Sequence, residues 1–147
     1  MKKRYPPVAE LVPHRPPMIL IDEILDIGEK SLSARVALTE RSPFVEDGKL
    51  PALVTLEYMA QSIAAFAGAA RRAEGKPVRL GLLIACREME LDVDSLSVGD
   101  ELEVTVNQVW TDEQLGSFDC LVTRRGEKIS RATLSVYQGD LSPEAAG

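Results

Sequence analysis

The chain has 147 residues, of which 45% are hydrophobic and 27% are charged, and its net charge is −6. This length and this balance fit one globular domain over residues 1–147, large enough to bury a core. The negative charge argues against a general nucleic-acid-binding protein.

Residues 1–17 are rich in proline, and we expect them to lie over the surface. His14, the one histidine of the chain, lies here between Pro13 and Pro16. A histidine exchanges a proton near neutral pH because its unperturbed pKa is about 6.5. Prolines stiffen the backbone that would aim it. Taken alone, this pattern is still more typical of a turn than of a catalytic base.

The next segments predict two strands and a long helix. Residues 18–26 are rich in Ile and Leu, residues 31–38 alternate between apolar and polar, and residues 42–50 form a loop. Pro51 favours the first position of a helix that runs to about Ala73. This helix is apolar or small almost all round, which is typical of a buried helix. Its polar interruptions argue against a membrane span.

Strands follow the helix, over residues 79–91, 102–107, 118–123 and 131–136, with a tight turn at Arg125-Gly126. Residues 138–147 are expected to form a loose tail. The order predicts an α+β hotdog fold, in which a curled antiparallel sheet of about six strands wraps one long buried helix. The exposed sheet edges predict a dimer. Cys86 and Cys120 lie in apolar segments, which favours buried free thiols in a reducing cytoplasm.

Glu57 is a carboxylate in this otherwise apolar helix, and Gln61 shares its face one turn later. A buried charge is costly unless it is paired, protonated or placed at a cavity. Desolvation raises the pKa of a glutamate, which would make Glu57 a usable acid near pH 7. A structural ion pair with Arg15 or Arg87 is an equally good interpretation.

The helix start offers backbone donors for a substrate oxygen. The N–H groups of Ala52, Leu53 and Val54 have no partners within the helix, and the helix dipole there favours negative charge. They could form an oxyanion hole. Simple hydration of the helix start is the alternative.

Three segments, in family order, resemble the 3-hydroxyacyl-[acyl-carrier-protein] dehydratases of fatty acid biosynthesis, which are hotdog proteins. Residues 11–22 resemble the family stretch LPHRYPFLLVD, residues 50–61 resemble MPGVLIIEAMAQ, and residues 98–102 resemble PGDQL. The first two segments are fairly specific, whereas the third is weak alone.

The resemblance implies that His14 is the catalytic histidine and that Glu57 is the catalytic acid, contributed by the neighbouring protomer of a homodimer. Oxyanion binding falls to the N–H groups of Ala52 and Leu53, and Ala52 replaces a family glycine. Substrate-binding positions are expected at three residues: Pro51, Gln61 and Phe44.

No metal, nicotinamide or other cofactor is expected, because the sequence has neither a ligand cluster nor a GxGxxG loop. The substrate would arrive on the phosphopantetheine arm of an acyl carrier protein, with no nucleic acid or membrane as partner. The carrier would dock on one of two basic clusters: Arg71, Arg72, Lys76 and Arg79, or Arg124, Arg125, Lys128 and Arg131.

The family's GHFPG loop is replaced by the shorter residues 43–49. The chain is therefore better described as resembling a divergent branch of this family, similar to aryl polyene or polyketide-type dehydratases. The expected reaction converts a 3-hydroxyacyl thioester to the trans-2-enoyl thioester. Two alternatives are a non-catalytic acyl-binding or dehydratase-partner protein, and a thioesterase in which Glu57 activates water.

Overall fold

The computed structural model describes residues 4–78 and 81–137, so the expected tail at 138–147 lies outside the described residues. Two short 3-10 helices, one α-helix and eight strands make up this part of the chain. In chain order they are η1 (Val8–Glu10), β1 (Glu23–Ile27), β2 (Ser31–Ala37), β3 (Lys49–Pro51), η2 (Ala52–Val54), α1 (Thr55–Ala73), β4 (Leu82–Leu91), β5 (Ser95–Ser97), β6 (Glu101–Thr111), β7 (Leu115–Arg124) and β8 (Glu127–Tyr137).

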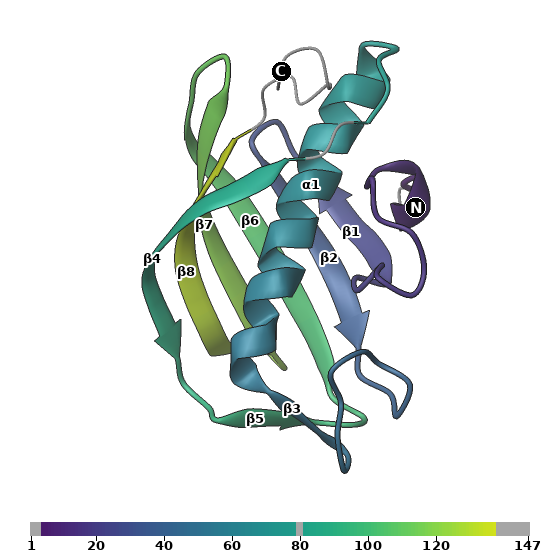
Figure 1. Cartoon of the computed structure of the whole chain (residues 1–147), viewed down its shortest axis with the longest axis vertical. Coiled ribbons are helices and arrows are strands. Elements are labelled where there is room, and N and C mark those ends of the chain that lie inside the picture. Colours follow the sequence, from purple (N-terminus) through teal and green to yellow (C-terminus); the bar gives the residue numbers. More distant parts are fainter. Residues whose placement is uncertain (1–3, 79–80, 138–147) are drawn as a thin grey trace, which may run out of the picture.

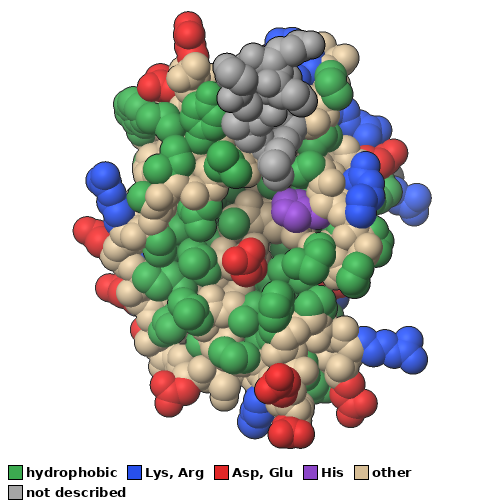
Figure 2. All heavy atoms as spheres, in the orientation of Figure 1, with side chains coloured by type: hydrophobic (Ala, Val, Ile, Leu, Met, Phe, Trp, Pro, Cys, Tyr) green, Lys and Arg blue, Asp and Glu red, His purple; other side chains and the backbone are tan. Residues whose placement is uncertain are grey.

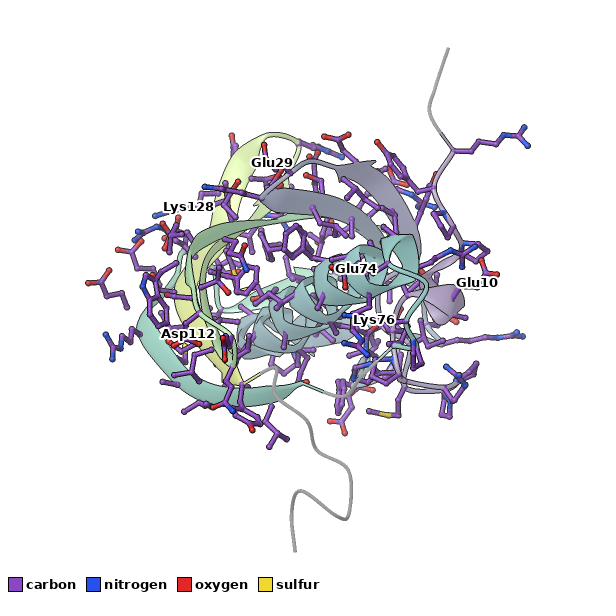
Figure 3. All side chains as sticks on the ribbon, turned by 90° about the horizontal axis from the view of Figure 1, so that it is seen from above. Glu10, Glu29, Glu74, Lys76, Asp112 and Lys128 are labelled. Atoms are coloured by element: carbon purple, nitrogen blue, oxygen red, sulfur yellow. The ribbon has the colours of Figure 1, made fainter. Side chains whose placement is uncertain are left out.

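A six-stranded sheet has the order β1-β2-β6-β7-β8-β4, and each neighbouring pair is antiparallel. The sheet curls around α1 (Figure 1), and the view from above shows the helix inside the curl (Figure 3). Strands β3 and β5 form a separate pair at the N-terminal end of the helix. The predicted α+β hotdog fold is therefore confirmed.

Alternating burial explains why the sheet packs on the helix. Buried and more exposed residues alternate along β2, the first half of β6, and most of β7 and β8, and all four strands contact α1. Phe118 of β7 is fully buried and meets the edge of Phe66 from α1, with ring centroids 5.8 Å apart. Each alternating strand thus contributes one apolar face to a single core.

The long helix behaves as a core element. By length and composition, Ala52–Ala73 could cross a membrane, but 56% of its apolar 18-residue stretch is buried inside the fold. A helix that is apolar nearly all round must bury those faces, and here the sheet covers much of it. The first turn is a 3-10 helix, so the α-helix itself begins at Thr55 rather than at Pro51.

The N-terminal segment differs from the expectation of a surface strap. Val8, Leu11 and Val12 are buried in the core cluster, because this segment crosses α1 before the chain enters the sheet. The first strand also begins later than predicted, at Glu23. Residues 18–21 lie along α1 instead of in a ladder, and their backbone groups bond to a side chain of the helix.

The predicted turn at Arg125-Gly126 is confirmed, and both residues have positive φ, as a two-residue hairpin of this kind requires. Cys120 is buried as predicted, whereas the prediction for Cys86 is wrong, because its side chain is exposed. Cys86 belongs to β4, which is the last strand of the sheet and has no neighbouring strand on its outer side among the described residues.

Candidate active site

A cavity of about 670 Å³ lies between α1, the segment that carries His14, and the sheet. His14 and Glu57 both line it, together with the apolar wall formed by Ala60, Ile63 and Phe66. Figure 2 shows the histidine beside a hollow that hydrophobic side chains flank. The structure thus brings the two predicted acid–base residues of one chain to one cavity, whereas the resemblance implied a Glu57 from the neighbouring protomer.

The position of His14 depends on its backbone. The side chain is half-buried, and its Nδ1 atom is buried without a hydrogen-bond partner among the described residues. Arg15 holds the adjacent backbone, because its guanidinium donates to the carbonyl of His14 at 2.8 Å and to that of Val12 at 3.3 Å. An imidazole that lines a cavity is a candidate to exchange a proton with a molecule bound there.

Glu57 lies in the first turn of α1 and is exposed in the single chain. The desolvation of Glu57 that the sequence suggested therefore requires another part of the protein or a partner chain to cover this carboxylate. Within residues 4–78 and 81–137 the salt bridges leave Glu57 without a basic partner. The alternative of an ion pair with Arg15 or Arg87 finds no support in this geometry.

The helix start requires a correction. The N–H of Ala52 donates to the carbonyl of Asp94 at 3.0 Å, so this predicted oxyanion donor is already occupied. The bond joins η2 to the turn before β5, a long-range contact that the sequence pattern does not reveal. Leu53, one residue later, is 58% exposed but is not among the residues that line the cavity in the single chain. Its N–H is the predicted oxyanion donor that remains.

Gln61 borders the cavity, yet only 3% of the residue is exposed. Its side-chain oxygen accepts hydrogen bonds from the N–H groups of Leu20 and Ile21. Its side-chain nitrogen donates to the carbonyl of Met18 at 2.9 Å. Three of the four hydrogen bonds that this amide can form therefore go to the backbone after His14.

Two other predicted substrate-binding residues stand apart. Neither Phe44 nor Pro51 is among the residues that line the cavity in the single chain. Phe44 is exposed, with a positive φ of 73°, and it belongs to the loop that precedes β3. A cation site is not formed either, since the described residues contain no group of three His, Cys, Asp or Glu side chains placed to hold a metal.

Tyr58, next to Glu57, takes no part in the cavity. It is buried in the core, and burial, with a further contribution from Asp22, raises its pKa to about 12. A phenol with this pKa stays neutral across the physiological range and is a poor proton donor. Of the two neighbours, Glu57 is the one placed for acid–base chemistry.

Charged residues lie at the end of the cavity near the C-terminus of α1. Arg71, Glu74 and Lys76 line this end, and Lys76 lies 3.1 Å from Glu74 (Figure 3). The second basic cluster lies elsewhere, because Arg124 and Arg125 line a separate depression beside β6. The sequence could not rank the two clusters, since only the fold shows which one is adjacent to His14.

Residues 6–146 match the ApeP-like family, described as ApeP dehydratase. The dehydratase heterocomplex ApeI:P from Xenorhabdus doucetiae contains a chain that is 28% identical, with a TM-score of 0.91 and 97% of each chain covered. A hypothetical thioesterase from Streptococcus pneumoniae, solved with coenzyme A, has a TM-score of 0.63 at 13% identity, covering 82% of this chain and 88% of its own.

The PaaI protein of the E. coli phenylacetic acid degradation operon has a TM-score of 0.61 at 12% identity, covering 78% of this chain and 81% of its own. At such identities the likeness to PaaI and to the thioesterase shows the fold alone. The curated proteins give no match.

Proposed function

The chain belongs to the ApeP-like dehydratase family, and from this premise we propose that it removes water from a 3-hydroxyacyl thioester to give the trans-2-enoyl thioester. The observation that carries the proposal is that His14 and Glu57 line one cavity with an apolar wall. An acyl chain fits the apolar wall, and the two polar groups fit the reacting end.

The reaction needs one base and one acid. Neutral His14 takes the proton from C2, next to the thioester carbonyl. Protonated Glu57 gives a proton to the hydroxyl on C3, which leaves as water while the C2–C3 double bond forms. The thioester oxygen gains negative charge on the way, and the N–H of Leu53 is the proposed donor to it. Proton exchange with water then restores both residues.

A second chain completes the site in this proposal. Glu57 is exposed in the single chain, and β4 presents a free edge with three exposed apolar residues in a row: Leu82, Leu83 and Ile84. Pairing along β4 would cover this surface and desolvate the carboxylate. The partner is a second copy of this chain or, as in the heterocomplex named above, a different dehydratase chain.

The carrier protein is proposed to dock at the end of the cavity that Arg71 and Lys76 line. A phosphodiester joins the phosphopantetheine arm to its carrier, and a carrier surface is acidic, so cations at the cavity mouth match both charges. The cluster around Arg124 is less suitable, because Arg124 and Arg125 line a separate depression and not the cavity that holds His14.

Hydration of a crotonyl thioester, the reverse reaction, tests the proposal. His14→Ala and Glu57→Gln are each expected to lower kcat by at least about 10²-fold, the usual contribution of a general acid or base. Ser62→Ala, which removes a hydroxyl bonded within α1, is the matched control and should keep its rate.

A thiol-reactive dye separates dehydration from hydrolysis, because only a thioesterase releases free thiol from the same substrate. Wild-type activity in either variant would overturn the assignment. If the protein binds the thioester but does not turn it over, either by itself or with a partner dehydratase present, it is a non-catalytic subunit instead.

A further inference from the structure

We propose that Gln61 is a positioning residue for His14, because its carboxamide fixes to α1 the segment that follows the histidine. The inference rests on the proposed function, since it takes His14 as the base. It assigns Gln61 a role other than the substrate contact that the sequence suggested.

The amide orientation of Gln61 is determined by its partners. The two N–H groups of Leu20 and Ile21 need an acceptor, and the carbonyl of Met18 needs a donor. Only one placement of the oxygen and nitrogen satisfies all three. The amide is buried, so these bonds are shielded from competition with water.

Gln61 takes the place of a neighbouring strand for this segment. Because β1 begins only at Glu23, the amides of Leu20 and Ile21 lie outside the sheet ladder. An unpaired buried N–H costs about 1–3 kcal/mol, so without Gln61 the segment would have to move toward another acceptor. Such a movement would begin four residues from His14.

The other end of the histidine segment is also anchored to α1. The carbonyl of Leu11 lies so close to Gly68 that a Cβ there would be 1.7 Å from the oxygen. Gln61 therefore bonds the chain after His14 to α1, and Gly68 lets the chain before His14 pack closely on the same helix. Since no side chain in the described part of the chain bonds Nδ1 of His14, these backbone contacts, with Arg15, set where the imidazole lies.

Glu57 precedes Gln61 by one helical turn on the same helix. One rigid element therefore carries the proposed acid and the anchor of the segment that bears the proposed base. A catalytic group displaced by about 1 Å can lose on the order of 10²-fold in rate. The loss should appear in kcat more than in KM, because the apolar wall of the cavity is unchanged.

Two variants and one control test this role. Gln61→Met keeps the length of the side chain and removes all three hydrogen bonds. Gln61→Glu keeps an acceptor for Leu20 and Ile21 but places a second oxygen against the carbonyl of Met18. Ser62→Ala is the control, since the Ser62 hydroxyl is also buried on α1 but donates to Tyr58 within the helix.

The first readout is the imidazole Cε1–H signal of His14 in the full chain, which is unambiguous because the protein has one histidine. We expect Gln61→Met to shift this signal and its titration curve and to lower kcat about 10²-fold, with KM within about threefold. Gln61→Glu should fold, and its His14 signal and its kcat should lie between those of Gln61→Met and wild type. Ser62→Ala should match wild type in both readouts.

A wild-type His14 signal and a wild-type kcat in either Gln61 variant would overturn the inference. A rise in KM with kcat unchanged would also overturn it, in favour of direct substrate contact. The His14 signal separates this result from failure of the proposed function: if wild-type protein shows no dehydratase activity, the signal still decides whether Gln61 positions the imidazole. If Gln61→Met does not fold, Gln61→Glu decides in both readouts.

Discussion

The hydroxyl of Thr55, at the start of α1, lies 2.7 Å from the hydroxyl of Ser130 in β8, and both residues are fully buried. Thr55 also donates to the carbonyl of Ala52 at 2.7 Å. Because a hydroxyl has one proton, Ser130 must be the donor in the bond between the two side chains. This pair connects the first turn of the helix to the sheet near Glu57.

Removing either hydroxyl should destabilise the fold. We expect Thr55→Val or Ser130→Ala to lower the free energy of unfolding by about 1–3 kcal/mol, because each leaves a buried partner unsatisfied. The double variant should cost less than the sum of the single variants. Urea unfolding of the four proteins measures this. Additive losses would show that the two hydroxyls do not interact.

Gly68→Ala should be costly for a steric reason. The new Cβ would lie 1.7 Å from the carbonyl oxygen of Leu11, so backbone must move. We expect a loss of more than about 1 kcal/mol, although alanine is intrinsically the better helix former. Thermal unfolding provides the measurement, with exposed Ala73→Ser as the control. Unchanged or increased stability in Gly68→Ala would contradict the close approach.

Asp100 should make stability depend on pH in the acid range. Burial alone would raise the pKa of this carboxyl, but the N–H of Ser97 and the guanidinium of Arg124 outweigh it and hold the pKa below its usual 3.8. A lowered folded-state pKa stabilises the fold above the unfolded value, and this contribution disappears as pH falls through the folded value.

Asp100→Asn should therefore be less stable than wild type at pH 7 by up to about 1 kcal/mol, because the pair is partly exposed. The difference should decrease below about pH 4. Denaturant unfolding at several pH values between about 7 and 2 checks this. A difference that stays constant with pH would assign the effect to packing.

The two cysteines should report on the free edge of β4. Burial raises the pKa of Cys120 to about 12, which makes it unreactive in the native protein, whereas Cys86 is exposed in the single chain. Assembly along β4 should protect Cys86. We expect slow labelling of the assembled protein and fast labelling of a variant with Ile84→Lys, whose charge opposes edge pairing.

Sedimentation measures whether that variant is indeed less assembled, and Cys86→Ser should remove the native labelling. Equal labelling rates at different states of assembly would place the interface elsewhere.

The strands β6, β7 and β8 could be predicted from sequence because each packs one face on α1 and leaves the other to solvent. The exposure of β4 in the single chain could not be predicted in the same way. Its apolar residues suit a covered strand, but it ends the sheet in the single chain. Sequence pattern reports which surfaces need covering, not which molecule covers them.

The candidate site shows a similar limit. The motifs predicted that His14 and Glu57 serve one site, and both residues line one cavity. Two details of the site depend instead on contacts between distant segments. The Ala52 N–H bonds to Asp94, and the Gln61 amide bonds to the backbone after His14. Helical spacing assigned Gln61 to the face of Glu57, but it could not show that residues 18–21 cover that position.

The exposed apolar row of β4 should affect the abundance of this protein in a cell. A copy without a partner presents Leu82, Leu83 and Ile84 on a strand edge that pairs with no other strand in the part of the chain that the structure describes. Such an edge promotes aggregation, and chaperones and proteases remove chains that expose one. The steady-state abundance of this chain should therefore follow the supply of whatever chain pairs with β4, so that unassembled subunits do not accumulate.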